Sequence, residues 1–120
     1  VQKSTQPTGY FAALSHPRIG AALNLVHTEK DGSLTVELLC SAAAMSRTRF
    51  NACFTQLVGE TPKAYLSNTR LLRAKKKLQD SQEPVTSIAE AAGYSSDSSF
   101  SKAVKKRFGM TPGKLRKSGQ

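Results

Sequence analysis

The sequence lacks several features that mark whole classes of protein. It has no tryptophan and only two cysteines, Cys40 and Cys53, among 120 residues. Two cysteines are too few for a disulfide-stabilised secreted scaffold. No apolar run approaches the roughly 18 to 20 residues that a membrane-spanning helix needs. No secretory signal is visible after Val1, and we expect the chain to be part of a longer protein.

Residues that could carry catalysis or bind a metal are also scarce. The two histidines, His16 and His27, have no cysteine at a metal-ligand spacing and no evident nucleophile or carboxylate partner. Cys40 is expected to be a small buried side chain in a helix. The sequence therefore predicts no enzyme activity, no metal site and no cofactor.

Acidic residues are few, and basic residues are unevenly placed. The chain has 18 Lys+Arg against 8 Asp+Glu, a net charge of +10. Residues 1–46 are neutral, so residues 47–120 carry the whole excess, and the stretch 102–117 has seven basic residues and no acidic one. Such a distribution favours a nucleic-acid binder. Two alternatives remain at this point. One is a basic module that docks an acidic protein or membrane surface through Lys75, Lys76 and Lys77, and the other is an ordinary solvated surface.

Apolar spacing predicts an all-α fold with no window of strand-like alternation. Thr35 and Ser46 are candidate helix caps, Gly59 a helix stop, and Thr61-Pro62 a new helix start. Seven helices are expected, at about 17–28, 36–43, 46–58, 62–79, 85–92, 96–108 and from 111 onward. We assign 1–15 to a linker tail, 16–66 to a first helix-turn-helix subdomain, 67–79 to the rest of a connecting helix, 80–117 to a second helix-turn-helix subdomain and 118–120 to a tail.

An internal repeat is the most informative pattern. Ser46, Phe50, Gly59, Thr61 and Pro62 recur 50 residues later as Ser96, Phe100, Gly109, Thr111 and Pro112. Before the turn the better offset is 49, which predicts one extra residue in the second turn. Each copy reads as a short helix, a tight turn and a longer helix, the helix-turn-helix pattern. Gly93 is expected to supply a positive φ in the second turn, where the first copy has Ala44.

The longer helix of each copy is predicted to be amphipathic. Phe50, Phe54 and Leu57 point inward in the first copy, and Phe100 and Val104 in the second. Short polar side chains with Arg or Lys on the outward side are typical of base-edge contacts in a major groove. On the connecting helix, basic residues lie opposite the Leu71 stripe and are candidates for phosphate contact.

These features together resemble the DNA-binding domain of AraC/XylS-type bacterial transcription regulators. The resemblance covers about residues 16–117. It rests on the stretches Met45-Ser46-Arg47, Leu57 to Pro62, Ile88-Ala89 with Ala92-Gly93-Tyr94, and above all Lys106-Arg107-Phe108-Gly109-Met110-Thr111-Pro112. The opening stretch from Phe11 to Gly20 looks like that of members with a cupin-like N-terminal half.

The resemblance implies two helix-turn-helix subdomains joined by a long central helix, with two recognition helices in successive major-groove segments of double-stranded DNA. The expected base-reading residues are Arg47, Thr48, Arg49, Asn51, Ser98, Ser99 and Lys102. Ala52 departs from the family, which often has Arg there. The expected phosphate contacts are Lys63, Arg70, Arg73, Lys77, Lys105, Lys106 and Lys114.

The same resemblance sets the expected partners. It implies a monomeric fragment in the bacterial cytoplasm, associated with the nucleoid through DNA, with RNA polymerase as a candidate partner. A small-molecule effector would act only through the N-terminal domain, and no membrane partner is expected.

Overall fold

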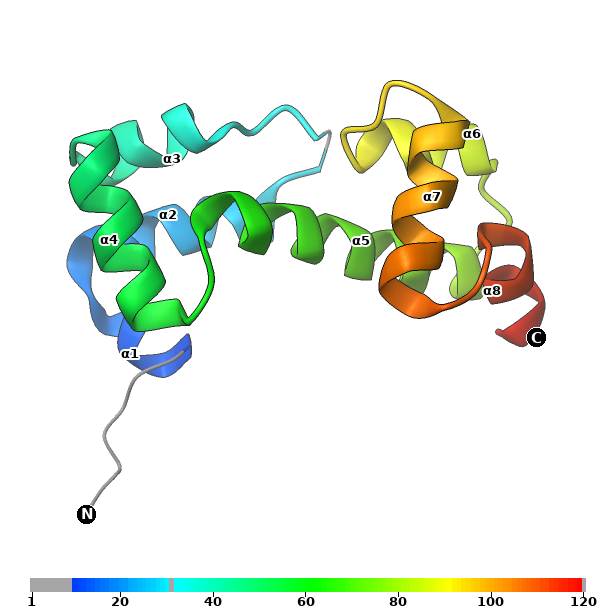
Figure 1. The fold of residues 1–120 in the computed structure, drawn as a ribbon, viewed down its shortest axis with the longest axis horizontal. Helices are drawn as coiled ribbons and strands as arrows, with labels where there is room; N and C mark the ends of the chain where they lie inside the picture. The colour runs from blue at the N-terminus through cyan, green and yellow to red at the C-terminus, as the bar shows by residue number, and fades with distance from the viewer. Residues whose placement is uncertain (1–9, 31, 120) are drawn as a thin grey trace, which may run out of the picture. The chain divides into compact units, whose positions relative to one another are not determined.

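The computed structural model describes residues 10–30 and 32–119, and this part of the chain holds eight α-helices and no strand (Figure 1). The helices are α1 (Tyr10–Ser15), α2 (Pro17–Thr28), α3 (Val36–Ala43), α4 (Arg47–Val58), α5 (Pro62–Asp80), α6 (Val85–Ala91), α7 (Asp97–Phe108) and α8 (Pro112–Ser118). The all-helical prediction is confirmed.

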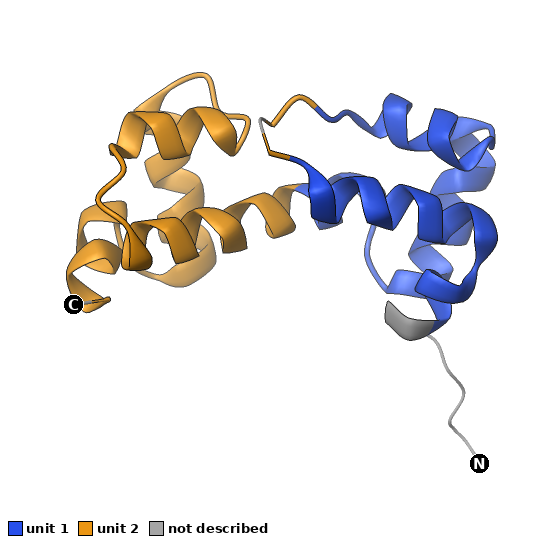
Figure 2. Ribbon diagram, turned by 180° about the vertical axis from the view of Figure 1, so that it is seen from behind, with its two compact units in different colours: residues 1–29, 34–66 blue, residues 30–33, 67–120 orange. Residues whose placement is uncertain are grey.

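The chain divides into two compact units (Figure 2). The first contains α1 to α4 and the start of α5, and ends at Leu66. The second contains the rest of α5 with α6 to α8, together with the short segment 30–33. Segment 30–33 belongs to the second unit because Gly32 fits against the α6–α7 turn. A side chain on Gly32 would come within 2.7 Å of the Ala91 carbonyl oxygen.

Side-chain caps fix where the helices begin. The hydroxyl oxygen of Thr35 accepts a hydrogen bond from the Leu38 amide at 3.2 Å, and that of Ser46 from the Arg49 amide at 3.3 Å. Ser96 and Thr111 cap α7 and α8 in the same way. Each cap satisfies an amide that has no partner within its own helix, so these residues set the helix starts locally.

The first unit has its own hydrophobic core. Ile19 and Leu23 of α2, Leu39 of α3, and Phe50 and Phe54 of α4 are fully buried in it. The two phenylalanine rings lie 5.5 Å apart between centroids. Burying a side chain of this size contributes roughly 1.5 to 3 kcal/mol to the stability of the fold. The two phenylalanines therefore anchor α4 to the rest of the first unit.

The second unit repeats this plan around Leu78 of α5, Ile88 of α6, Phe100 and Val104 of α7, and Leu115 of α8, all of which are buried. The Arg116 side chain closes the unit by donating hydrogen bonds to the Leu78 and Glu83 carbonyl oxygens. These bonds join α8 to the end of α5 and to the segment between α5 and α6.

The structure corrects the expected helix count and the tail assignment. Residues 10–15, expected to be linker, form α1, whose Ala13 is fully buried. Gly20 allows this because a Cβ there would lie 2.5 Å from the Leu14 carbonyl oxygen, and its absence lets α1 approach α2. The rest of the expected tail, residues 1–9, lies outside the described residues. At the other end, α8 extends to Ser118, into the expected C-terminal tail.

Candidate nucleic-acid interface

The two helix-turn-helix turns share one backbone design. The Met45 amide donates to the Cys40 carbonyl at 3.1 Å, and 49 residues later the Tyr94 amide donates to the Ala89 carbonyl at 3.0 Å. Ala44 and Gly93 adopt positive φ angles of 55° and 88°. These bonds have the six-to-one pattern of a helix end whose last residue is left-handed. The predicted repeat and the conformation of Gly93 are confirmed.

Burial defines the outward face of α4. Because Phe50 and Phe54 are fully buried, Thr48, Arg49 and Ala52 project to the surface. Asn51, predicted to read bases, is only partly exposed and lies on the flank of the helix. Gln56 is exposed one turn beyond Ala52, on the same face. Gln56 is not among the base-reading residues predicted from the sequence, although its helical spacing from Ala52 places it on the same face.

Arg47 has an intramolecular partner at the start of α4. Its guanidinium forms a short ion pair with the Glu37 carboxylate of α3. The two side chains are 57% and 69% exposed, so water screens the pair and its contribution to stability is small. Arg47 is therefore held near the turn by an interaction that another anion can replace.

The outward face of α7 carries the second predicted set. Phe100 and Val104 are buried, while Ser98 and Lys102 are exposed. The Ser99 hydroxyl accepts a hydrogen bond from the Ser96 hydroxyl at 3.0 Å. The structure thus brings Ser98, Ser99 and Lys102 together on one exposed surface of the second unit.

The residues predicted to contact DNA phosphates differ in their exposure and in their contacts within the protein. Lys63, Lys105, Lys106 and Lys114 are exposed. Two others are already engaged within the second unit. Arg70 donates from Nη2 to the Gly32 carbonyl at 3.1 Å, and Lys77 Nζ lies 3.6 Å from the Glu83 carboxylate. Arg73 is partly buried. The structure thus gives Arg70 a structural role in addition to its charge.

The histidines act as structural groups. Nδ1 of His16 accepts hydrogen bonds from the Arg18 and Ile19 amides, both at 3.2 Å, and so caps α2. His27 Nε2 lies 2.8 Å from the Tyr65 hydroxyl. Sequence reasoning did not identify the His16 cap because histidine is rarely used at this position.

The two cysteines lie in different surroundings: Cys40 is buried, whereas Cys53 is partly exposed, with its Sγ 3.9 Å from His16 Nε2. Burial raises the pKa of the Cys40 thiol, and Cys40 lies in the core of the first unit. Within residues 10–30 and 32–119, no cluster of three or more His, Cys, Asp or Glu side chains could hold a metal ion. No helix in this part is both long and apolar enough to cross a membrane.

Comparison with known proteins gives this surface its context. A family described as a helix-turn-helix domain matches residues 39–118. The transcriptional regulator AlkR of Acinetobacter baylyi is 40% identical over 88% of this chain and 35% of its own length. The transcriptional activator RclR of Escherichia coli is 42% identical over 88% of this chain and 37% of its own length. The chain thus spans little more than a third of these relatives.

Two solved structures that resemble this chain have the same fold and come from transcription factors. An AraC-type regulator structure from Chromobacterium violaceum superposes with a TM-score of 0.81, at 28% identity over 89% of this chain and 96% of that one. The DNA-binding domain of AdpA, solved in complex with a target DNA, superposes with a TM-score of 0.77, at 26% identity over 87% of this chain and 93% of that one. The repeated turns and the exposed helix faces agree with these matches. The chain belongs to the AraC-type family of helix-turn-helix DNA-binding domains, which are parts of transcription regulators and not enzymes.

Proposed function

We propose that this chain is the sequence-specific, double-stranded DNA-binding part of a bacterial transcription regulator, and that both α4 and α7 read bases in the major groove. The observation that carries the proposal is the repeated design. Each unit buries one side of the second helix of its helix-turn-helix, α4 or α7, and leaves a polar or basic side of that helix exposed. Two helices built alike but with different exposed residues favour one asymmetric binding site for each chain.

Base reading is assigned to the exposed residues of the two helices. Lys102 can donate to the O6 and N7 acceptors of guanine, and Thr48 and Ser98 can contact several bases. Asn51 is the candidate for adenine recognition, provided that its partly buried amide reaches the groove. Arg47 can join them by exchanging Glu37 for a base edge.

Affinity is assigned mainly to phosphate contacts. Lys63 of the first unit and Lys105, Lys106 and Lys114 of the second are exposed cations on or beside the DNA-reading elements. Phosphate contacts position a protein on DNA, whereas base contacts specify the sequence. Arg73 is a weaker candidate because it is partly buried.

The remaining roles belong to the whole protein. An effector would act through a part of the protein outside this chain, and regulation would include contact with RNA polymerase. The fragment is expected to bind as a monomer and to work in the cytoplasm at the nucleoid. Docking to an acidic protein through Lys75–Lys77 receives no support from the relatives, and Lys75 Nζ already lies 5.1 Å from the centre of the Phe108 ring.

Selection of bound duplexes from a random pool tests the proposal directly. We expect an asymmetric consensus with two base-reading clusters about ten base pairs apart, one for each unit. Inserting five base pairs between the clusters should reduce affinity to that of one unit plus non-specific contacts. Native mass spectrometry should show one chain for each site. A palindromic consensus bound by two chains, or indifference to the insertion, would contradict the two-reader proposal.

A further inference from the structure

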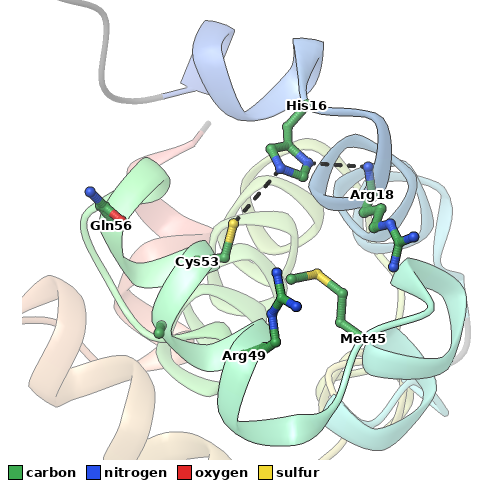
Figure 3. Close-up of a pocket in the computed structure, with 7 residues that line it drawn as sticks. His16, Arg18, Met45, Arg49, Cys53 and Gln56 are labelled. Atoms are coloured by element: carbon green, nitrogen blue, oxygen red, sulfur yellow. Dashed lines mark hydrogen bonds between the residues drawn. The ribbon is translucent and has the colours of Figure 1, made fainter.

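An open hollow of about 540 Å³ lies in the first unit, beside the exposed face of α4. Its walls come from the start of α2, the α3–α4 turn and α4 itself. His16, Arg18, Met45, Arg49 and Cys53 surround it, and Gln56 stands at its edge (Figure 3). No acidic side chain lines it.

Two guanidinium groups share this hollow. Arg18 is held in place because its Nη1 donates to the Ala44 carbonyl at 2.6 Å, which leaves its other N–H donors available. The Arg49 side chain extends into the hollow (Figure 3). Within the described part of the chain, no hydrogen bond or ion pair engages the Arg49 guanidinium. Two like charges beside one open hollow favour an anion between them, because its attraction to both offsets their mutual repulsion.

The other walls do not compete for an anion and do not neutralise the arginines. Nδ1 of His16 is occupied, because it accepts hydrogen bonds from the Arg18 and Ile19 amides. Nε2 faces the Cys53 sulfur at 3.9 Å. Met45 adds a thioether, which is uncharged. The α2 cap thus fixes His16 in the wall of the hollow.

We propose that this hollow seats one backbone phosphate of the bound DNA, held by Arg49 together with Arg18. The inference rests on the proposed function and changes the role of one predicted base reader: Arg49 binds phosphate. A DNA phosphate is the occupant because the hollow is open and adjoins the exposed face of α4, which is the surface assigned to the groove. A guanidinium fork matches the geometry of phosphate oxygens.

The second unit has no copy of this site. Ser99 occupies the position of Arg49, and Ala103 that of Cys53, at the 50-residue offset. His16 and Arg18, which line the far wall, come from the start of α2 and precede the first repeat. The first unit is therefore expected to bind a backbone phosphate through Arg49, and the second unit has no arginine at the equivalent position.

Neutral-backbone scanning tests the phosphate site. First a specific duplex is selected. Single uncharged methylphosphonate linkages then replace each phosphate in turn, on both strands, around the base-reading cluster assigned to α4. At one linkage we expect the wild-type chain to lose roughly tenfold in affinity, as for a hydrogen-bonded ionic contact. Arg49→Ala should bind the unmodified duplex correspondingly less well and lose nothing further at that linkage. Arg47→Ala is the matched control, because it removes the same side chain two residues away and should keep the full methylphosphonate penalty.

The outcomes separate this site from the proposed function. If Arg49→Ala instead relaxes preference at a single base pair, Arg49 reads bases and the phosphate site is wrong. The same holds if Arg49→Ala retains the wild-type penalty at every linkage. Inorganic phosphate at millimolar concentration should not perturb the NMR amide signals around Arg49, and saturable binding would identify a free-anion site instead. If the wild-type chain selects no duplex, it is the proposed function that fails. Circular dichroism of Arg49→Ala, a surface substitution, should match the wild type.

Discussion

Arg47 and Glu37 form an ion pair that links the recognition helix of the first unit to the helix before it. The second unit makes the same link with a single charged partner, since the Thr86 hydroxyl donates to the Asp97 carboxylate at 3.0 Å. Thr86 and Asp97 stand at the repeat positions of Glu37 and Arg47. Both units therefore tie the first residue of α4 or α7 back to the preceding helix, with opposite charge on that residue.

The exposed Arg47–Glu37 pair predicts that Glu37 competes with DNA for Arg47. Glu37→Gln should raise affinity for the selected duplex several-fold, because an exposed pair is worth only about 0.2 to 1 kcal/mol and its carboxylate repels phosphate. Glu90→Gln is the matched control, since it removes one exposed carboxylate elsewhere. The gain over Glu90→Gln should disappear in an Arg47→Ala background. Fluorescence anisotropy titrations measure the affinities of these variants and of the wild type, and an equal gain from both glutamine variants would show that only net charge matters.

Lys102 is predicted to read a base and Lys105 a phosphate. Lys102→Ala should cost about 1 to 3 kcal/mol on the selected site and relax preference at one position. Lys105→Ala, on the same helix and also exposed, should weaken target and random duplexes alike. Competition binding against single-base variants of the site distinguishes the two effects. A uniform loss for Lys102→Ala would remove it from the reading set.

The salt dependence of binding reports the phosphate contacts as a whole. If six to eight phosphates are neutralised, log K should fall against log salt concentration with a slope of roughly −5 to −7. DNA-binding titrations at salt concentrations from about 50 to about 200 mM provide the measurement. Affinity that barely changes with salt would contradict binding through the basic surface.

Arg70 is predicted to stabilise the second unit. Its guanidinium bonds the Gly32 carbonyl and lies against Gly93, where an added Cβ would come 3.0 Å from Arg70 Nη1. Arg70→Ala should lower the free energy of unfolding by about 1 to 3 kcal/mol, because a charged donor to a half-buried carbonyl is lost. Lys76→Ala, an exposed cation on the same helix, should change it by less than about 0.5 kcal/mol. Urea unfolding monitored by circular dichroism compares them, and equal stabilities would leave Arg70 a role in DNA contact alone.

The two cysteines should differ in reactivity. Burial raises the pKa of Cys40, so less of it is thiolate at a given pH above neutrality, and the core shields it from reagents. Cys53, which is partly exposed at the hollow, should react with iodoacetamide at pH 8 well before Cys40 does. Peptide mass mapping over time provides the measurement. Urea should abolish the difference, because unfolding exposes both thiols.

Local sequence determined the helices and the repeat. Capping side chains such as Ser46 and Thr111 bond amides only three residues away, so their effect can be read from neighbouring residues. The inward phenylalanines of α4 and α7 follow from helical spacing, and their burial is confirmed. The family resemblance rested on these same local features.

Only the tertiary structure decided which basic residues are free. Arg70 bonds Gly32 across 38 residues of chain, and no local pattern specifies that contact. Helix α1 likewise exists because Ala13 packs into a core that residues far along the chain complete. The hollow at Arg49 needs three elements brought together, with His16 capping one of them. Periodicity places a residue on a face of its helix, whereas the partner it meets there depends on how distant segments pack.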